Sequence, residues 1–159
     1  MNLSAPRFGF LLAGLVLIAD QFTKWWIFAE LMNPPRVIPI APILNIVPVM
    51  NPGASFGMFG SAPHWVRWAL VVFALAIAIW LSIWLKYVTE RLLAAGLGLV
   101  IGGAVGNVVD RFRIGAVLDF LDFHWEAYHW PAFNVADSAI TLGVALLVLD
   151  ALKSRPGSS

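Results

Sequence analysis

Residues 92–109, LLAAGLGLVIGGAVGNVV, decide the fold, because this run carries no charged side chain from end to end. Residues 68–85, WALVVFALAIAIWLSIWL, form a second run without charge. A helix needs about 20 mostly apolar residues to cross the hydrocarbon core of a bilayer. Together with their flanking residues, the two runs predict membrane-spanning helices over about 67–86 and about 92–110.

The composition places the whole chain in a membrane. Of its 159 residues, 60% are hydrophobic and 12% are charged, whereas soluble domains carry about 25% charged and about 45–50% apolar residues. We therefore interpret residues 1–159 as a single integral membrane domain. The net charge of +1, without a basic cluster, argues against a nucleic-acid partner. The chain has no cysteine, which excludes disulfides, thiolate catalysis and a lipid anchor on its own thiol.

Two further helices become long enough only if they include charged residues. The apolar run that starts at residue 8 stops at Asp20, and another lies between Asp137 and Asp150. To span a bilayer, these helices must extend over about 8–28 and about 132–152. Because the first helix ends on the side where the last one begins, Asp20 and Asp137 are expected near the same membrane interface.

Lysine and arginine in the loops indicate the orientation. They are equally numerous on the two sides, but on one side they are concentrated in short segments, namely the N-terminus, the turn at 86–91 and the C-terminal tail. This density predicts that both termini are cytoplasmic. The polar ends of the first and last helices would then face outward, which in a bacterium means the periplasm.

The connection over about 29–65 is rich in proline and has β-like segments at 36–40 and 43–49. It predicts a small sheet lying on the membrane. The expected fold is therefore an all-α membrane protein with four transmembrane helices and a small periplasmic sheet.

Glycine recurs at spacing four in the third helix, at Gly98, Gly102 and Gly106. Such a stripe of small residues lets another helix approach closely. Helix packing is the simplest interpretation of all three, and Gly106 could also leave room for a substrate.

The third helix ends in polar residues that share one face. Asn107 and Asp110 are three residues apart, and Asn107 and Arg111 are four apart. Two interpretations stay open: a hydrogen-bond network that ties the helices together, or a direct catalytic role. In the first, an Asp110–Arg111 or Asp20–Arg111 ion pair would brace the helices.

Asp119 and Asp137 are the strongest candidates for chemistry. A carboxylate at membrane depth is costly and is by default a functional hypothesis, which applies to Asp137. Asp119 follows a turn after the third helix. In a loop a carboxylate is commonly a cap or a solvated charge, but the apolar neighbours Leu118 and Phe120 would raise the pKa of Asp119. Two such carboxylates could share a proton and activate water.

Two other kinds of site are disfavoured. His124, Glu126 and His129 match no metal-ligand spacing, so we predict no metal site and interpret residues 122–126 as the wet face of a strand or loop. Ser55, in a glycine-rich turn, has no histidine or lysine placed by sequence to activate it as a nucleophile.

Five motifs follow one another along the chain. They are Asp20-Gln21-Phe22-Thr23-Lys24, Asn51-Pro52-Gly53-Ala54-Ser55-Phe56-Gly57, Gly106-Asn107-Val108-Val109-Asp110-Arg111, Val117-Leu118-Asp119-Phe120 and Pro131-Ala132-Phe133-Asn134-Val135-Ala136-Asp137-Ser138. Together they closely resemble the lipoprotein signal peptidase family, also called signal peptidase II. The resemblance covers about residues 8–152, with small departures at Pro52 and Ser55.

The resemblance implies four transmembrane helices, cytoplasmic termini and a periplasmic β-cradle. It implies cleavage of the signal peptide just before the diacylglyceryl-modified cysteine of bacterial prolipoproteins, inhibition by the cyclic peptide globomycin, and no cofactor. The partners would be these prolipoproteins and membrane lipid. The family's catalytic pair maps to Asp119 and Asp137. Supporting or lining positions map to Asp20, Lys24, Asn51, Gly53, Gly106, Asn107, Arg111, Asn134 and Ala136.

The expected mechanism is that of an intramembrane aspartyl endopeptidase. One carboxylate takes a proton from water, and the other protonates the carbonyl oxygen and later the leaving amine. Asn51, Asn134 or Arg111 could polarise the carbonyl. The alternative is a small proton-coupled membrane carrier that uses the same carboxylates, although carriers often show internal repeats and this chain has none. A subunit of an assembly would leave the two aspartates unexplained.

Overall fold

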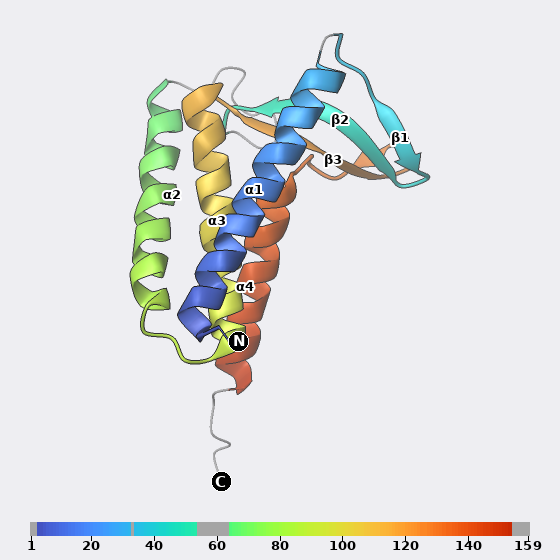
Figure 1. Ribbon diagram of the computed structural model, residues 1–159. Helices are drawn as coiled ribbons and strands as arrows, with labels where there is room; N and C mark the ends of the chain where they lie inside the picture. The colour runs from blue at the N-terminus through green and yellow to red at the C-terminus, as the bar shows by residue number, and fades with distance from the viewer. Residues whose placement is uncertain (1–2, 33, 54–63, 154–159) are drawn as a thin grey trace.

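The computed structural model describes residues 3–32, 34–53 and 64–153, which form a helical bundle with a small sheet at one end (Figure 1). The helices are α1 (Ala5–Leu31), α2 (His64–Leu85), α3 (Arg91–Arg113) and α4 (Val135–Lys153). Each is long and apolar enough to cross a membrane. The prediction of four such helices is therefore confirmed.

Helix α3 is the centre of the bundle. It packs against each of the other three helices. Of the residues in its most apolar stretch 67% are buried, whereas the share is 28% or less in the other helices. Its glycines explain this position, because a Cβ atom at Gly98 would lie 2.3 Å from the carbonyl oxygen of Gly9, and one at Gly103 would lie 2.4 Å from that of Ala136. The backbones of α1 and α4 thus occupy the space that side chains on α3 would need.

Adding one methyl group at this contact should destabilise the protein. Gly98→Ala is expected to cost about 1–3 kcal/mol of unfolding free energy, because the clash is with backbone that cannot rotate away. Gly14→Ala is the matched control, since a Cβ atom there would meet nothing within 4 Å in the part of the chain that the structure describes. Thermal unfolding in detergent measures both variants. Equal melting temperatures would contradict the close approach of α1 and α3.

The sheet is antiparallel, with strand order β1-β2-β3-β4. Its strands are β1 (Ile38–Ala41), β2 (Leu44–Asn51), β3 (Val117–Trp125) and β4 (Tyr128–His129). A small sheet within 29–65 was predicted and is confirmed by β1 and β2. Asp119 was expected in a loop, and this expectation is wrong. Asp119 lies on β3 and pairs with Val49 of β2.

The reason for this error lies in how β3 is buried. A half-exposed strand shows alternating polar and apolar residues, but residues 117–120 are all buried, the charged Asp119 among them. The C-terminal end of α1 covers this strand. Ile27 and Leu31 of α1 cluster with Leu118 and Phe120 of β3, so α1 holds in place the strand that carries Asp119.

Helix α4 begins at Val135, three residues later than the predicted 132. Phe133, two residues before the helix, is extended and forms a β-bridge with Leu121 of β3. Both hydrogen bonds of this bridge are made, at 2.8 and 3.0 Å. The bridge fixes the start of α4, and with it Asp137, against the strand that carries Asp119.

Candidate active site

The side chain of Asn134 joins the two candidate aspartates. Its amide nitrogen Nδ2 donates to Oδ1 of Asp119 at 2.7 Å, and its oxygen Oδ1 accepts from the backbone N–H of Asp137 at 2.9 Å. Asn134 is completely buried, so neither contact competes with water. The structure therefore brings Asp119 of β3 and Asp137 of α4 to a single site.

Asn134 is also the N-cap of α4. Its oxygen accepts from the N–H of the third helical residue, and that residue's carboxylate in turn accepts from the backbone N–H of Asn134, at 3.3 Å. This reciprocal arrangement is a capping box. Its acidic member is Asp137, so the local signal that starts the helix also holds this aspartate in place. A carboxylate in the first turn is further favoured by the helix dipole.

Asp119 lies in a nearly closed setting, with 2% of its surface exposed. Besides Asn134, it accepts a hydrogen bond from Nδ2 of Asn51 at 2.9 Å. The pKa of Asp119 is raised to about 6, chiefly by burial; the hydrogen bond from Asn51 lowers it and the negative charge of Asp137 adds to the rise. Asp119 can therefore gain or lose a proton near neutral pH.

Asp137 is half-buried and has a second asparagine partner. Nδ2 of Asn107, on α3, donates to Oδ1 of Asp137 at 2.8 Å. The guanidinium of Arg111 lies one turn further along α3 and interacts electrostatically with Asp137 and Asp119. Its Nη1 donates to the carbonyl of Asn107 at 3.3 Å, while its buried Nε has no hydrogen-bond partner in the described structure.

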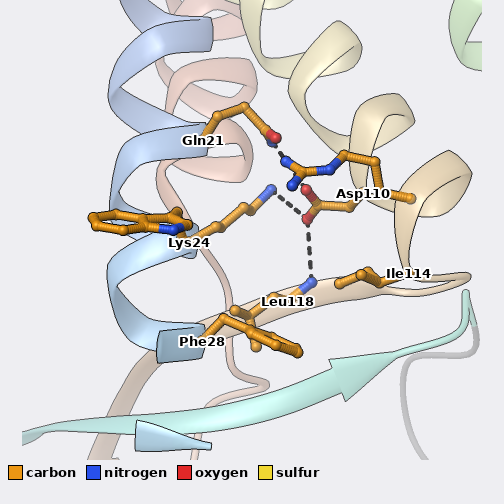
Figure 2. A pocket seen from close by; sticks show the side chains of 8 residues that line it. Gln21, Lys24, Phe28, Asp110, Ile114 and Leu118 are labelled. Carbon is orange, nitrogen blue, oxygen red and sulfur yellow. Dashed lines mark hydrogen bonds and ion pairs between the residues drawn. The ribbon is translucent and has the colours of Figure 1, made fainter. Parts of the chain in front are cut away.

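The ion pairs that brace the helices are made by Lys24. The predicted pairs, made by Arg111 with Asp110 or Asp20, are not the ones that form. Nζ of Lys24 lies 2.9 Å from Oδ2 of Asp20 and 2.9 Å from Oδ2 of Asp110. Figure 2 shows Lys24 reaching Asp110 from α1, with Gln21 beside it. Arg111 follows Asp110 directly, and neighbouring residues on a helix point in different directions, which is why this pair does not form.

Three small residues of the predicted site position the polar side chains next to them. A Cβ atom at Gly106 would lie 2.6 Å from Oδ2 of Asp20, so the space at this glycine is filled by that carboxylate and is not room for a substrate. Ala136 donates its backbone N–H to Oδ1 of Asp20 at 2.9 Å. Gly53, at φ 109°, donates its N–H to Oδ1 of Asn51 at 2.9 Å and so orients the Asn51 side chain.

Gln21 belongs to this cluster but was not among the predicted site residues, and Asp110 was weighed for a network or catalytic role without being mapped to the family's site. Nε2 of Gln21 donates to Oδ1 of Asp110 at 2.9 Å, and Oδ2 of Asp110 accepts from the backbone N–H of Leu118 at 3.2 Å. The signal for Gln21 was its position one turn before Lys24 on α1. The contact of Asp110 with the backbone of β3 has no sequence signal.

Asp122 stands apart from this cluster. Its carboxylate pairs with Nδ1 of His129 at 2.8 Å and accepts from Nδ2 of Asn45 at 3.1 Å. His124 stacks on His129. Within the described ranges no group of three histidine or acidic residues could hold a metal ion. Ser55, weighed above as a nucleophile, lies outside the described residues.

Two substitutions should move the pKa of Asp119 in opposite directions. Asn51→Leu removes a hydrogen bond to the ionised carboxylate, so the pKa should rise above its value of about 6. Asp137→Asn removes a negative charge, so the pKa should fall. Infrared difference spectra of the protonated carboxyl band against pH measure both, with Asp119→Asn as the blank. A fall of the Asp119 pKa in Asn51→Leu, or a rise in Asp137→Asn, would contradict these causes of its pKa.

The four apolar helices and the carboxylate site beside the sheet define a class of protein, a multi-pass membrane protein with its polar site at one end of the bundle. A family model described as "Signal peptidase (SPase) II" matches residues 12–153. The chain belongs to the signal peptidase II family and is therefore a peptidase. Family membership leaves the alternative of a proton-coupled carrier without support.

Relatives and solved structures agree with this assignment. Proteins named "Lipoprotein signal peptidase" from Paraburkholderia phymatum and Beijerinckia indica are each 44% identical to this chain, over 97% and 95% of it and 92% of each relative. A solved structure described as "Bacterial membrane enzyme structure by the in meso method at 2.3 A resolution" matches with a TM-score of 0.79 and 30% identity, over 95% of this chain and 91% of that one.

Proposed function

We propose that this protein is an intramembrane aspartyl endopeptidase that removes the signal peptide from diacylglyceryl-modified bacterial prolipoproteins, cutting just before the lipidated cysteine. Membership in the signal peptidase II family supports the reaction class, and the name of its relatives, "Lipoprotein signal peptidase", supports the substrate class. The observation that carries the aspartyl mechanism is the bridge through Asn134 between Asp119 and Asp137.

In the proposed reaction the two carboxylates hold one proton between them. Asp119 is the member whose burial favours the protonated form, with a pKa of about 6. The ionised carboxylate takes a proton from water, which attacks the scissile carbonyl, and the protonated one donates to the carbonyl oxygen. As the C–N bond breaks, the carboxylate that took up the proton from water delivers it to the leaving amine, and the other aspartate recovers its proton from a hydroxyl of the tetrahedral intermediate. No metal or organic cofactor takes part.

Arg111 is the best-placed group to polarise the scissile carbonyl. The asparagines are already engaged: Asn51 donates to Asp119 and accepts from Gly53, and Asn134 donates to Asp119. Arg111 instead has a buried Nε that finds no hydrogen-bond partner among the described residues, and its positive charge interacts with both aspartates. A fixed donor of this kind stabilises the negative charge that develops on a carbonyl oxygen.

The surface of the bundle supports a location in lipid. Large apolar side chains such as Ile18, Val72 and Phe73 are about two-thirds exposed, which in water would form an unusually large apolar surface. The start of α1 and the end of α4 lie at one end of the bundle, and the sheet lies at the other (Figure 1). We place the protein in the bacterial inner membrane, with cytoplasmic termini and the aspartates facing the periplasm.

This orientation makes a prediction about reporter fusions. A reporter fused after residue 159 should be active in the cytoplasm, and one inserted within 40–60 should be active in the periplasm, because the short segments in which lysine and arginine are densest stay inside. Paired alkaline phosphatase and fluorescent-protein fusions at both sites measure this. A C-terminal reporter that is active only in the periplasm would reverse the proposed orientation.

The proposed function is tested with the purified protein in detergent and a diacylglyceryl-modified precursor. Mass spectrometry of the products should show a new N-terminus at the lipidated cysteine, in the presence of EDTA as in its absence. Globomycin should block the reaction, and the same precursor without the diacylglyceryl group should stay uncut. Equal cleavage of both precursors would overturn the substrate class, and loss of activity in EDTA that Zn²⁺ restores would overturn the metal-free mechanism.

A further inference from the structure

We propose that Lys24 is a positioning residue that sets the placement of Asp119 relative to Asp137, by holding one hydrogen-bonded chain to each of them. The proposal rests on the proposed function, since it concerns how the same site is assembled. It differs from a plain structural brace, because the contacts of the Lys24 ammonium lead to the residue just before each aspartate and, through Asn107, to the Asp137 carboxylate.

All three N–H donors of the Lys24 ammonium have a partner. Nζ lies 2.9 Å from Oδ2 of Asp20, 2.9 Å from Oδ2 of Asp110 and 3.0 Å from Oδ1 of Asn107. An ammonium has three donors and no acceptor, so this set is complete. Lys24 is 4% exposed, and its three partners come from α1 and α3. The ammonium is thus the junction between these helices.

Each of the two carboxylates passes the connection on to the backbone next to a catalytic candidate. Asp20 accepts from the backbone N–H of Ala136 at 2.9 Å, and Ala136 is the residue immediately before Asp137. Asp110 accepts from the backbone N–H of Leu118 at 3.2 Å, and Leu118 immediately precedes Asp119. Figure 2 shows the second chain, from Lys24 through Asp110 to Leu118.

The third contact acts on a side chain. A lysine can only donate, so its contact with Asn107 must be to the amide oxygen. This orients the Asn107 amide so that its Nδ2 points at Asp137, to which it donates at 2.8 Å. With the amide turned around, its oxygen would face the Asp137 carboxylate, and the hydrogen bond would become a repulsion. Lys24, whose contact is shorter than the 3.3 Å one from Nδ2 of Asn134 to the same oxygen, therefore favours the amide orientation that the site needs.

The absence of cysteine from the chain allows a test at the level of single atoms. Lys24→Cys introduces one thiol beside a cavity of about 120 Å³ that Lys24 lines. Alkylation with 2-bromoethylamine, followed to completion by mass spectrometry, rebuilds a lysine-length ammonium with three N–H donors. Alkylation with (2-bromoethyl)trimethylammonium restores the charge without any donor. Lys86→Cys, at an exposed lysine in the turn after α2, is the matched control for both reagents.

The expected effect is on kcat rather than on KM. Lys24→Cys should lower kcat about 10²-fold, because a displacement of catalytic groups of order 1 Å has that consequence, while KM and globomycin binding stay near the wild-type values. The aminoethyl form should recover most of kcat, and the trimethylammonium form should not. Recovery of kcat with both reagents would show that only the positive charge of Lys24 matters. Recovery with neither would contradict a role of its N–H donors in positioning.

Lys24→Arg keeps the charge should the thiol variant fail to fold. Its planar donors cannot reach the same three acceptors from one nitrogen, so kcat should fall even where globomycin still binds. Wild-type kcat in Lys24→Arg or in unmodified Lys24→Cys would overturn the proposal and leave the peptidase assignment intact. If the wild-type protein itself cuts no lipidated precursor, the proposed function fails instead.

Discussion

Asp119→Asn and Asp137→Asn are each expected to abolish cleavage of a lipidated precursor while the protein still inserts and folds. Asparagine keeps the size of the side chain and an oxygen acceptor, but it cannot take or give a proton. A positioned acid or base contributes about 10²–10⁴ in rate, and removing either member of a coupled pair costs nearly the whole of their joint contribution.

The matched control for this prediction is Asp122→Asn. Asp122 lies on the same strand as Asp119 and is also buried, but its partners are His129 and Asn45 and not Asn134. This variant should keep near-normal turnover. Binding of globomycin by all three variants separates loss of chemistry from loss of folding. A large loss in Asp122→Asn would indicate that the strand tolerates no change of charge, and would remove the specific role of Asp119.

The second large effect is expected at Asn134, and two substitutions there separate stability from chemistry. Asn134→Ala removes both the N-cap of α4 and the donor to Asp119. It should lower kcat by about 10²-fold, from misplacement of the carboxylates. It should also cost about 1 kcal/mol of stability, as loss of an N-cap does.

Asn134→Ser tests the separation directly. Serine is a good N-cap, so the melting temperature in detergent should stay close to that of the wild type. Its shorter side chain cannot also reach Asp119, so kcat should still fall. A serine variant with wild-type kcat would show that the bridge between the aspartates is dispensable, and that Asn134 acts only as the cap of α4.

The helices and the candidate aspartates could be predicted from sequence for identifiable reasons. The runs without charge at 68–85 and 92–109 are long enough to demand membrane helices. The short run after Asp137 demands that this carboxylate lie near the membrane interface. The role of Asp119 was predicted from its apolar neighbours and its motif, but its position on a strand was not predicted. Its strand is buried on both faces next to the residue, so it shows no alternating pattern.

The hydrogen bonds and ion pairs within the site could not be predicted. Asp20, Lys24 and Asp110 were each visible as costly charges, but which charges pair depends on how α1 and α3 rotate against each other. That rotation is set by backbone contacts at the α3 glycines. The same contacts decide that Gly106 makes room for Asp20. The spacing of polar residues indicates which face of a helix is polar. It does not indicate which other helix or strand packs against that face.

The central claim, that Asp119 and Asp137 work as one unit, is tested most directly by the turnover of the double variant Asp119→Asn/Asp137→Asn beside the two single variants. Groups that act as a unit are strongly non-additive, so the double variant should be little slower than either single variant, and all three should be close to background. The measurement is the rate of cleavage of a diacylglyceryl-modified precursor, with globomycin binding as the check of folding. Near-normal turnover in either single variant, or losses that multiply in the double variant, would contradict the aspartyl pair.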